Sequence, residues 1–143
     1  MTSNKRRIKR IAVELPVTVC LFDGKGKKRV GDPLDGRIKN FSPMGAALNV
    51  ATIMLQGKHL FYTCQDNPDT ILELSFELGS NPGQIITVPA MPVWFDWDIE
   101  SKEKQFVVGL KFLAETKSPE IKTLSQEACK DEKRLVSLWK KLF

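Results

Sequence analysis

The strongest constraint on the fold is a series of short apolar segments in which apolar and polar residues alternate. The clearest runs from Leu72 to Leu78, and a longer one covers residues 11–22. Such alternation is typical of strands with one buried face. Turn residues separate these runs from further apolar segments. At this spacing they predict a mainly β fold, a six-stranded antiparallel β-barrel, with strands at residues 11–22, up to 40, 46–50, 72–78, 84–95 and 105–113.

Two segments of the predicted barrel are irregular. Pro16 lies inside the first strand, where a proline indicates a sheet edge or a bulge. Residues 51–69 contain apolar side chains without a clean period and end in a strong turn at residues 66–69. We expect this segment to fold over the barrel as a short connection.

The C-terminal segment, residues 116–143, is predicted to be a helix. Ser118 and Pro119 suit the N-cap and the first helical position. The polar residues 130–133 predict either a break or an exposed turn. The apolar stripe is expected to pack on the barrel; the alternative is an oligomer or partner helix with Trp139 and Phe143 as anchors. The stripe consists of Ile121, Leu124, Ala128, Leu135, Leu138 and Leu142.

Composition favours one ordinary domain of 143 residues. No apolar run is long enough to span a bilayer, and the N-terminus lacks the apolar stretch of a secretory signal, so a cytoplasmic location is predicted. Three separated cysteines, Cys20, Cys64 and Cys129, are expected to be free thiols. The single histidine, His59, is expected in a loop or at an edge. These residues predict no metal, no cofactor and no catalysis.

Charge is distributed unevenly along the chain. Residues 1–10 contain five basic residues and no acid, whereas residues 65–103 contain eight acids and only Lys102 as a basic residue. A long nucleic acid would meet the acidic region, but a small anion would not. We therefore expect a flexible basic arm over residues 1–10 that binds a small anion.

Two short motifs could supply that anion site. Arg6 and Arg10 lie four positions apart in the arm, and Asn40, Ser42 and Gly45 lie in a turn between two strands. Turn amides and hydroxyls can hold phosphate oxygens, and glycine lets a ligand approach the backbone. Arginine binds phosphate bidentately and pairs with the O6 and N7 edge of guanine. A ligand with both guanine and phosphate would use all of these groups.

The spacing Arg6-x-x-x-Arg10 followed by Asn40-x-Ser42-x-x-Gly45 resembles the paired signature of PilZ domains, bacterial receptors for cyclic di-GMP. A late strand, residues 106–112, also resembles that family. The resemblance implies that Arg6 and Arg10 hold guanine and phosphate. It further implies that Asn40 meets a guanine edge, that Ser42 meets phosphate, and that Gly45 permits close approach. The neighbours Lys5 and Arg7 are further candidate ligand-binding residues.

Several alternatives remain open on the sequence. The chain could be a PilZ-type adaptor that binds a protein and no nucleotide, or a barrel that binds single-stranded nucleic acid through its arm and aromatic residues. A downstream protein partner is expected, and the chain could be a monomer or a homodimer. Of two tryptophans in the acidic region, Trp94 is expected in the core and Trp97 at the surface.

Overall fold

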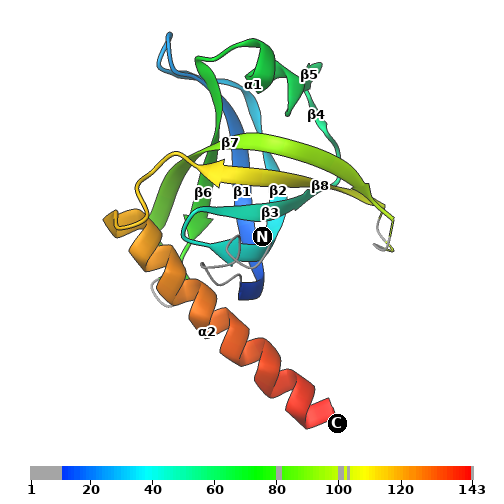
Figure 1. Cartoon of the computed structure of the whole chain (residues 1–143), viewed down its shortest axis with the longest axis vertical. Helices are drawn as coiled ribbons and strands as arrows, with labels where there is room; N and C mark the ends of the chain where they lie inside the picture. The colour runs from blue at the N-terminus through cyan, green and yellow to red at the C-terminus, as the bar shows by residue number, and fades with distance from the viewer. Residues whose placement is uncertain (1–10, 80–81, 100–101, 103, 143) are drawn as a thin grey trace, which may run out of the picture.

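The computed structural model describes residues 11–79, 82–99, 102 and 104–142, with side chains described up to residue 133. Six long strands close into an antiparallel barrel in the order β1-β2-β3-β8-β7-β6 (Figure 1). The predicted six-stranded barrel is confirmed. The strands are β1 (Ile11–Asp23), β2 (Lys28–Ser42), β3 (Gly45–Val50), β6 (Thr70–Glu77), β7 (Ile85–Asp98) and β8 (Gln105–Phe112).

The barrel interior is filled by the alternate residues that the sequence pattern assigns to one face. Burial of these apolar side chains is the main favourable contribution to folding. Phe41 and Phe112 also stack across the interior with ring centroids 5.6 Å apart. Fully buried side chains from the strands include Val19, Leu21, Ile38, Leu48, Val50, Leu72, Leu74 and Val88.

Pro16 occupies a place in β1 that has a strand on one side only. It pairs with Arg37 of β2, whereas β6 pairs with β1 only from Thr18 to Asp23. The register of β1 is also irregular between Ala12 and Leu15. The expected bulge is therefore present beside the proline, and among the described residues no strand pairs with the second side of Pro16.

The segment between β3 and β6 folds over one end of the barrel, as expected (Figure 1). It forms a small hairpin, β4 (Met54–Leu55) and β5 (Lys58–His59), followed by the short helix α1 (Tyr62–Asp66). Ile53, Leu55, Leu60 and Cys64 from this segment are buried in the core.

Four rings join this covering segment to β7 in an aromatic cluster of His59, Phe61, Tyr62 and Phe95. Phe95 is central, with its ring 4.8 Å from His59, 5.3 Å from Phe61 and 5.6 Å from Tyr62. Offset and edge contacts at these distances are favourable for aromatic pairs. The cluster therefore packs the covering segment against β7 at this end of the barrel.

His59 has a larger structural role than the loop or edge position that the sequence predicts. Its Nδ1 accepts hydrogen bonds from the backbone N–H groups of Phe61 and Tyr62, both at 3.1 Å. Only a neutral imidazole can accept in this way. Burial lowers the pKa of His59, which keeps the ring neutral at physiological pH.

The C-terminal helix α2 spans Pro119–Leu142 without interruption, so the break considered at residues 130–133 is absent. Ser118 Oγ accepts the N–H of Ile121 at 3.4 Å, as expected of an N-cap. The side chains of Ile121, Leu124 and Ala128 are buried against the barrel. Those of Trp139 and Phe143 lie outside the described part. In the part of the chain that the structure describes, no helix is long and apolar enough to cross a membrane.

Candidate functional site

The predicted motif residues Asn40, Ser42 and Gly45 meet at the turn between β2 and β3. Ser42 and Gly45 are paired across the turn. Ser42 Oγ donates to the Gly45 carbonyl and accepts from the Met44 N–H, both at 3.3 Å. The hydroxyl thus stabilises the turn. The side chain of Asn40, two residues before Ser42, is exposed.

Gly45 is explained by a contact within the barrel. A Cβ at this position would lie 2.1 Å from the carbonyl oxygen of Leu110 in β8. The Phe112 N–H also donates to the Met44 carbonyl at 2.9 Å, which holds the turn against the same strand. A glycine is therefore required at position 45, because another group comes close to its Cα. The group that approaches is the backbone of β8.

The four candidate basic residues Lys5, Arg6, Arg7 and Arg10 lie outside the described residues. The described chain begins at Ile11, which pairs with Phe41, the residue before Ser42. The first described residue of β1 therefore lies beside the motif turn.

A line of small residues crosses the outer face of the barrel at Asn40. Asn40 is the cross-strand partner of both Ala12 in β1 and Ala47 in β3. Ala47 pairs with Gly109 in β8, which pairs in turn with Trp94 in β7. With strands about 4.8 Å apart, Asn40 and Trp94 are separated by roughly 14 Å. We call these five cross-strand neighbours the small-residue row, after the three small residues among them: Ala12, Asn40, Ala47, Gly109 and Trp94.

Trp94 is the last residue of the small-residue row, and its ring covers the neighbouring Gly109. Its indole lies over Gly109, because a Cβ there would be 2.1 Å from the indole Nε1. The side chain is 49% exposed, so the prediction that Trp94 belongs to the core is wrong. An irregularity between Pro92 and Trp94 changes the register of β7 and places the ring outside. A sequence signal does exist, since an aromatic residue opposite a strand glycine often covers it.

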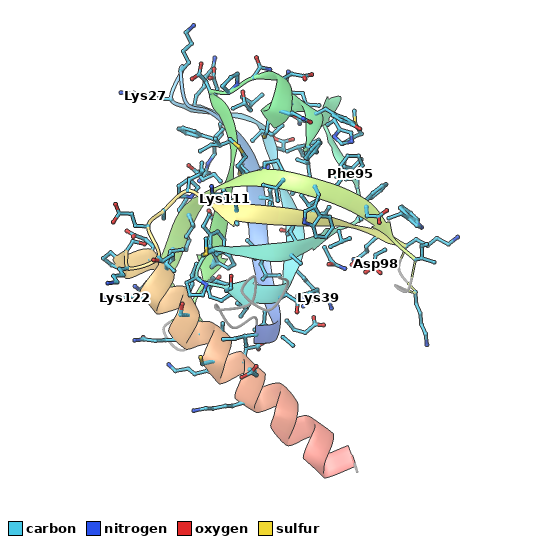
Figure 2. The ribbon with its side chains drawn as sticks, viewed as in Figure 1. Lys27, Lys39, Phe95, Asp98, Lys111 and Lys122 are labelled. Carbon is cyan, nitrogen blue, oxygen red and sulfur yellow. The ribbon has the colours of Figure 1, made fainter. Side chains whose placement is uncertain are left out.

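Lys111 adds a cation to this face that the sequence reasoning did not assign to the site. It pairs with Gly45 in the next row along β3 and β8, and its side chain is exposed. Figure 2 shows Lys111 on β8, in front of the barrel. The outer face beside the motif therefore offers the Asn40 amide, the exposed Trp94 indole and the exposed side chain of Lys111.

The acidic group nearest in sequence to the arm is already paired. Glu14 in β1 forms ion pairs with Lys39 and, at 3.8 Å, with Arg37. Its backbone N–H donates to Asp131 of α2 at 2.7 Å. Since two cations offset this carboxylate, it adds little repulsion toward an anion bound at Asn40.

A groove of about 670 Å³ lies further along the outer face and does not include the motif. Its lining includes Thr18, Arg37 and Asn49. The buried Asn49 amide is already committed, since its Nδ2 donates to Asp98 at 3.0 Å and to Gln105 at 3.5 Å. We place the candidate site at Asn40 because the Asn40 amide and the nearby Trp94 indole are both exposed to solvent.

The thiols of Cys20 and Cys64 are buried and are not activated nucleophiles. Burial raises the pKa of Cys64 to about 11 and also raises that of Cys20. A thiol rather than a thiolate is then present at neutral pH, and only the thiolate is reactive. Within the described ranges no group of His, Cys, Asp and Glu residues could hold a metal ion. The predicted absence of catalysis stays a prediction.

Comparison with known proteins places this site on a recognised fold. No family model matches the sequence, and no curated protein matches it. Solved structures do match. The PilZ domain of YcgR from Escherichia coli, solved with c-di-GMP, superposes with a TM-score of 0.58 at 15% identity, covering 96% of this chain and 98% of that one. PlzA from Borreliella burgdorferi, solved in complex with c-di-GMP, gives 0.50 at 16% identity, covering 98% of this chain and 55% of that one.

The chain therefore has the fold of a PilZ domain. The fold expected from the sequence resemblance is confirmed across almost the whole chain. At 15% and 16% identity the comparison shows the fold alone.

Proposed function

We propose that this protein is a cyclic di-GMP receptor and that the ligand binds along the small-residue row. The observation that carries the proposal is the juxtaposition of Asn40 and Ala47 with the exposed Trp94 indole, which covers Gly109. The small side chain of Ala47 leaves room for a flat ligand between Asn40 and the indole. The root of the basic arm lies at the opposite end, since Ile11 and Ala12 begin β1 there.

Each part of the ligand has a chemical counterpart in the proposed site. An arginine fork can bind phosphate or the guanine edge bidentately. The Asn40 amide can both donate to and accept from a guanine edge. The exposed Trp94 indole is a stacking surface, and stacking of a base on an aromatic side chain contributes about 1–3 kcal/mol. We assign Lys111 to a phosphate.

The motif residues receive divided roles in this proposal. Asn40 meets the base, whereas Gly45 acts by holding β3 against β8. Ser42 remains a candidate phosphate ligand in addition to stabilising the turn. Arg6 and Arg10 supply the charged contacts, and Lys5 and Arg7 are the secondary candidates.

We further propose that ligand binding orders the arm and that this change is the signal. The arm is rich in charge and poor in apolar residues, so its ordering has to be offset by contacts with an anion. A downstream protein would read the ordered surface. We also propose that the protein acts in the cytoplasm of a bacterium. The second candidate, an adaptor without nucleotide, is less favoured because Asn40 and Trp94 are exposed on this face.

Isothermal titration calorimetry with cyclic di-GMP tests the proposal. Wild-type protein is expected to bind saturably and to select cyclic di-GMP over GMP. The variant Arg10→Ala should weaken binding by about 100-fold, because it removes a bidentate charge-assisted contact. Lys25→Ala is the matched control, since it removes one positive charge from the exposed β1–β2 turn. Unchanged affinity in Arg10→Ala would overturn the assigned role, and no binding by the wild type would favour the adaptor.

A further inference from the structure

Two acidic residues follow Trp94 along β7 on the same outer face of the barrel. Alternate residues of a strand point to the same side of a sheet, so Trp94, Asp96 and Asp98 form one line. Two contacts agree with this assignment. The Trp94 indole covers Gly109 on the outside of β8. Asp98 accepts a hydrogen bond at 3.0 Å from Asn49 of β3, whose side chain lies on the same face as that of Ala47.

The two acids differ in what they already bind. Asp98 is committed, since its Oδ2 accepts from the buried amide of Asn49. Asp96 is exposed, and its Oδ1 accepts the Trp97 N–H at 2.8 Å. This bond holds the carboxylate in a defined orientation beside the strand. In the described part of the chain no group donates to Asp96 Oδ2, so that oxygen can accept hydrogen bonds from a ligand.

The spacing of Asp96 and Trp94 suits a base stacked on the indole. Residues two apart in a strand have Cα atoms about 6.6 Å apart, and side chains of a strand stand out from the sheet. A purine lying on the exposed indole would therefore present one edge to the neighbouring carboxylate. A base that is stacked on an aromatic ring and bound along its Watson–Crick edge is a common form of nucleotide recognition.

We propose that Asp96 determines base specificity at Trp94 by accepting hydrogen bonds from guanine. This inference rests on the proposed binding of cyclic di-GMP along the small-residue row. The Watson–Crick edge of guanine has two adjacent donors, the N1–H and the N2 amine, and a carboxylate has two oxygens that can accept from them. Adenine instead presents the lone pair of its N1 on this edge, which a carboxylate repels. Asp96 therefore favours guanine and disfavours adenine.

The position of Asp96 is also compatible with an anionic ligand. The negative charge of cyclic di-GMP is on its phosphates, whereas its guanine bases are neutral. Lys111, which we assign to a phosphate, pairs with Met91, three residues before Trp94. Asp96 follows Trp94 and pairs with Val107. The ammonium and the carboxylate thus lie on opposite sides of the indole, so one can hold a phosphate while the other accepts from the base.

Calorimetric titration with cyclic di-GMP and with cyclic di-IMP tests this inference, because hypoxanthine lacks only the N2 amine of guanine. The wild type is expected to bind cyclic di-GMP about tenfold more tightly than cyclic di-IMP. Asp96→Asn keeps an acceptor for the Trp97 N–H and should reduce this preference to about twofold. Asp69→Asn is the matched control, since it makes the same chemical change at an exposed residue beside the β1–β2 turn. It should keep the wild-type preference.

The outcomes separate this inference from the proposed function. Cyclic di-GMP binding by the wild type with the same preference in Asp96→Asn would overturn the role of Asp96 alone. An equal loss of affinity for both ligands, or a wild type without the preference, would overturn it as well. No binding of cyclic di-GMP by the wild type would overturn both.

Cyclic di-AMP tests the discrimination against adenine. Asp96→Asn should bind it about threefold more tightly than the wild type does, because the asparagine amide can donate to the adenine N1. The Asp69→Asn control should bind it as weakly as the wild type. Equal affinities of all three proteins for cyclic di-AMP would overturn the role of Asp96 against adenine.

Discussion

Two adjacent residues of β7 show how differently the two faces of this barrel are built. Trp94 stands on the outer face over Gly109, with small residues between it and Asn40. Phe95 points instead to the aromatic cluster, where three rings from residues 59–62 surround it (Figure 2). One ring is left uncovered beside small side chains, and the other is covered by a segment of the chain.

This comparison separates binding from stability along a single strand. A ring in a closed cluster contributes through the contacts that it makes within the fold. An indole that is 49% exposed loses little buried contact area when the protein unfolds, so it contributes little to stability. It does offer a stacking surface to a ligand. We therefore expect mutations on the outer face to change ligand affinity and mutations in the cluster to change stability.

The largest expected effect is structural and lies within the motif. Gly45→Ala should destabilise the protein by at least about 3 kcal/mol, because its Cβ would overlap the Leu110 carbonyl oxygen. Chemical denaturation measures this loss. Gly79→Ala is the control, since the nearest atom to its Cβ would be 4.0 Å away. A stable Gly45→Ala variant that fails only in binding would show that the glycine serves the ligand after all.

The next effect is expected in the aromatic cluster. Phe95→Ala should lower the free energy of unfolding by about 2 kcal/mol, since it removes three ring contacts from a half-buried position. Affinity for cyclic di-GMP at a temperature well below the unfolding transition should be unchanged. Loss of affinity without loss of stability would contradict the division between the two faces.

Trp94→Ala should show the opposite behaviour. Affinity for cyclic di-GMP should fall by about tenfold through loss of base stacking, while the unfolding temperature changes little. Trp97→Ala is the control, because Trp97 is similarly exposed but packs against Phe106 at 4.6 Å, away from Asn40. Equal effects of both substitutions would remove the argument for a stacking role.

The smallest expected effect is a pH dependence of the aromatic cluster. The pKa of His59 is lowered from its ordinary 6.5, so the folded state binds the proton less readily than the unfolded state. The contribution of His59 to stability is then present above pH 6.5 and is lost as pH falls through the lowered pKa. As pH falls from 6.5 to below the lowered pKa of His59, the unfolding temperature should drop by about 3 °C. His59→Asn keeps an acceptor without titrating and should flatten this part of the profile.

The barrel could be predicted from sequence because its signals are local. Alternation defines the strand between Leu72 and Leu78, and turn residues bound the less regular apolar runs. Six such strands leave few ways to avoid open edges other than closure. The helix was predictable for the same reason, from Ser118, Pro119 and the apolar spacing that follows.

The site was only partly predictable because its remaining features depend on register. Residues 84–95 are apolar on both faces, so periodicity cannot assign Trp94 to either side. The irregularity after Pro92 decides the matter, and it depends on pairing with β8. The contact of Gly45 with Leu110 is equally nonlocal. The motif spacing indicated a turn at Asn40, Ser42 and Gly45, but it could not show which strand required the glycine.

Fluorine NMR of protein labelled with 5-fluorotryptophan tests the central claim most directly. The chain has three tryptophans, and single Trp→Phe variants would assign their resonances. Saturating cyclic di-GMP is predicted to shift the resonance of Trp94 and to leave that of Trp97 in place. A bound ligand that leaves Trp94 unchanged, or that shifts Trp97 instead, would contradict the proposal that the small-residue row is the binding site.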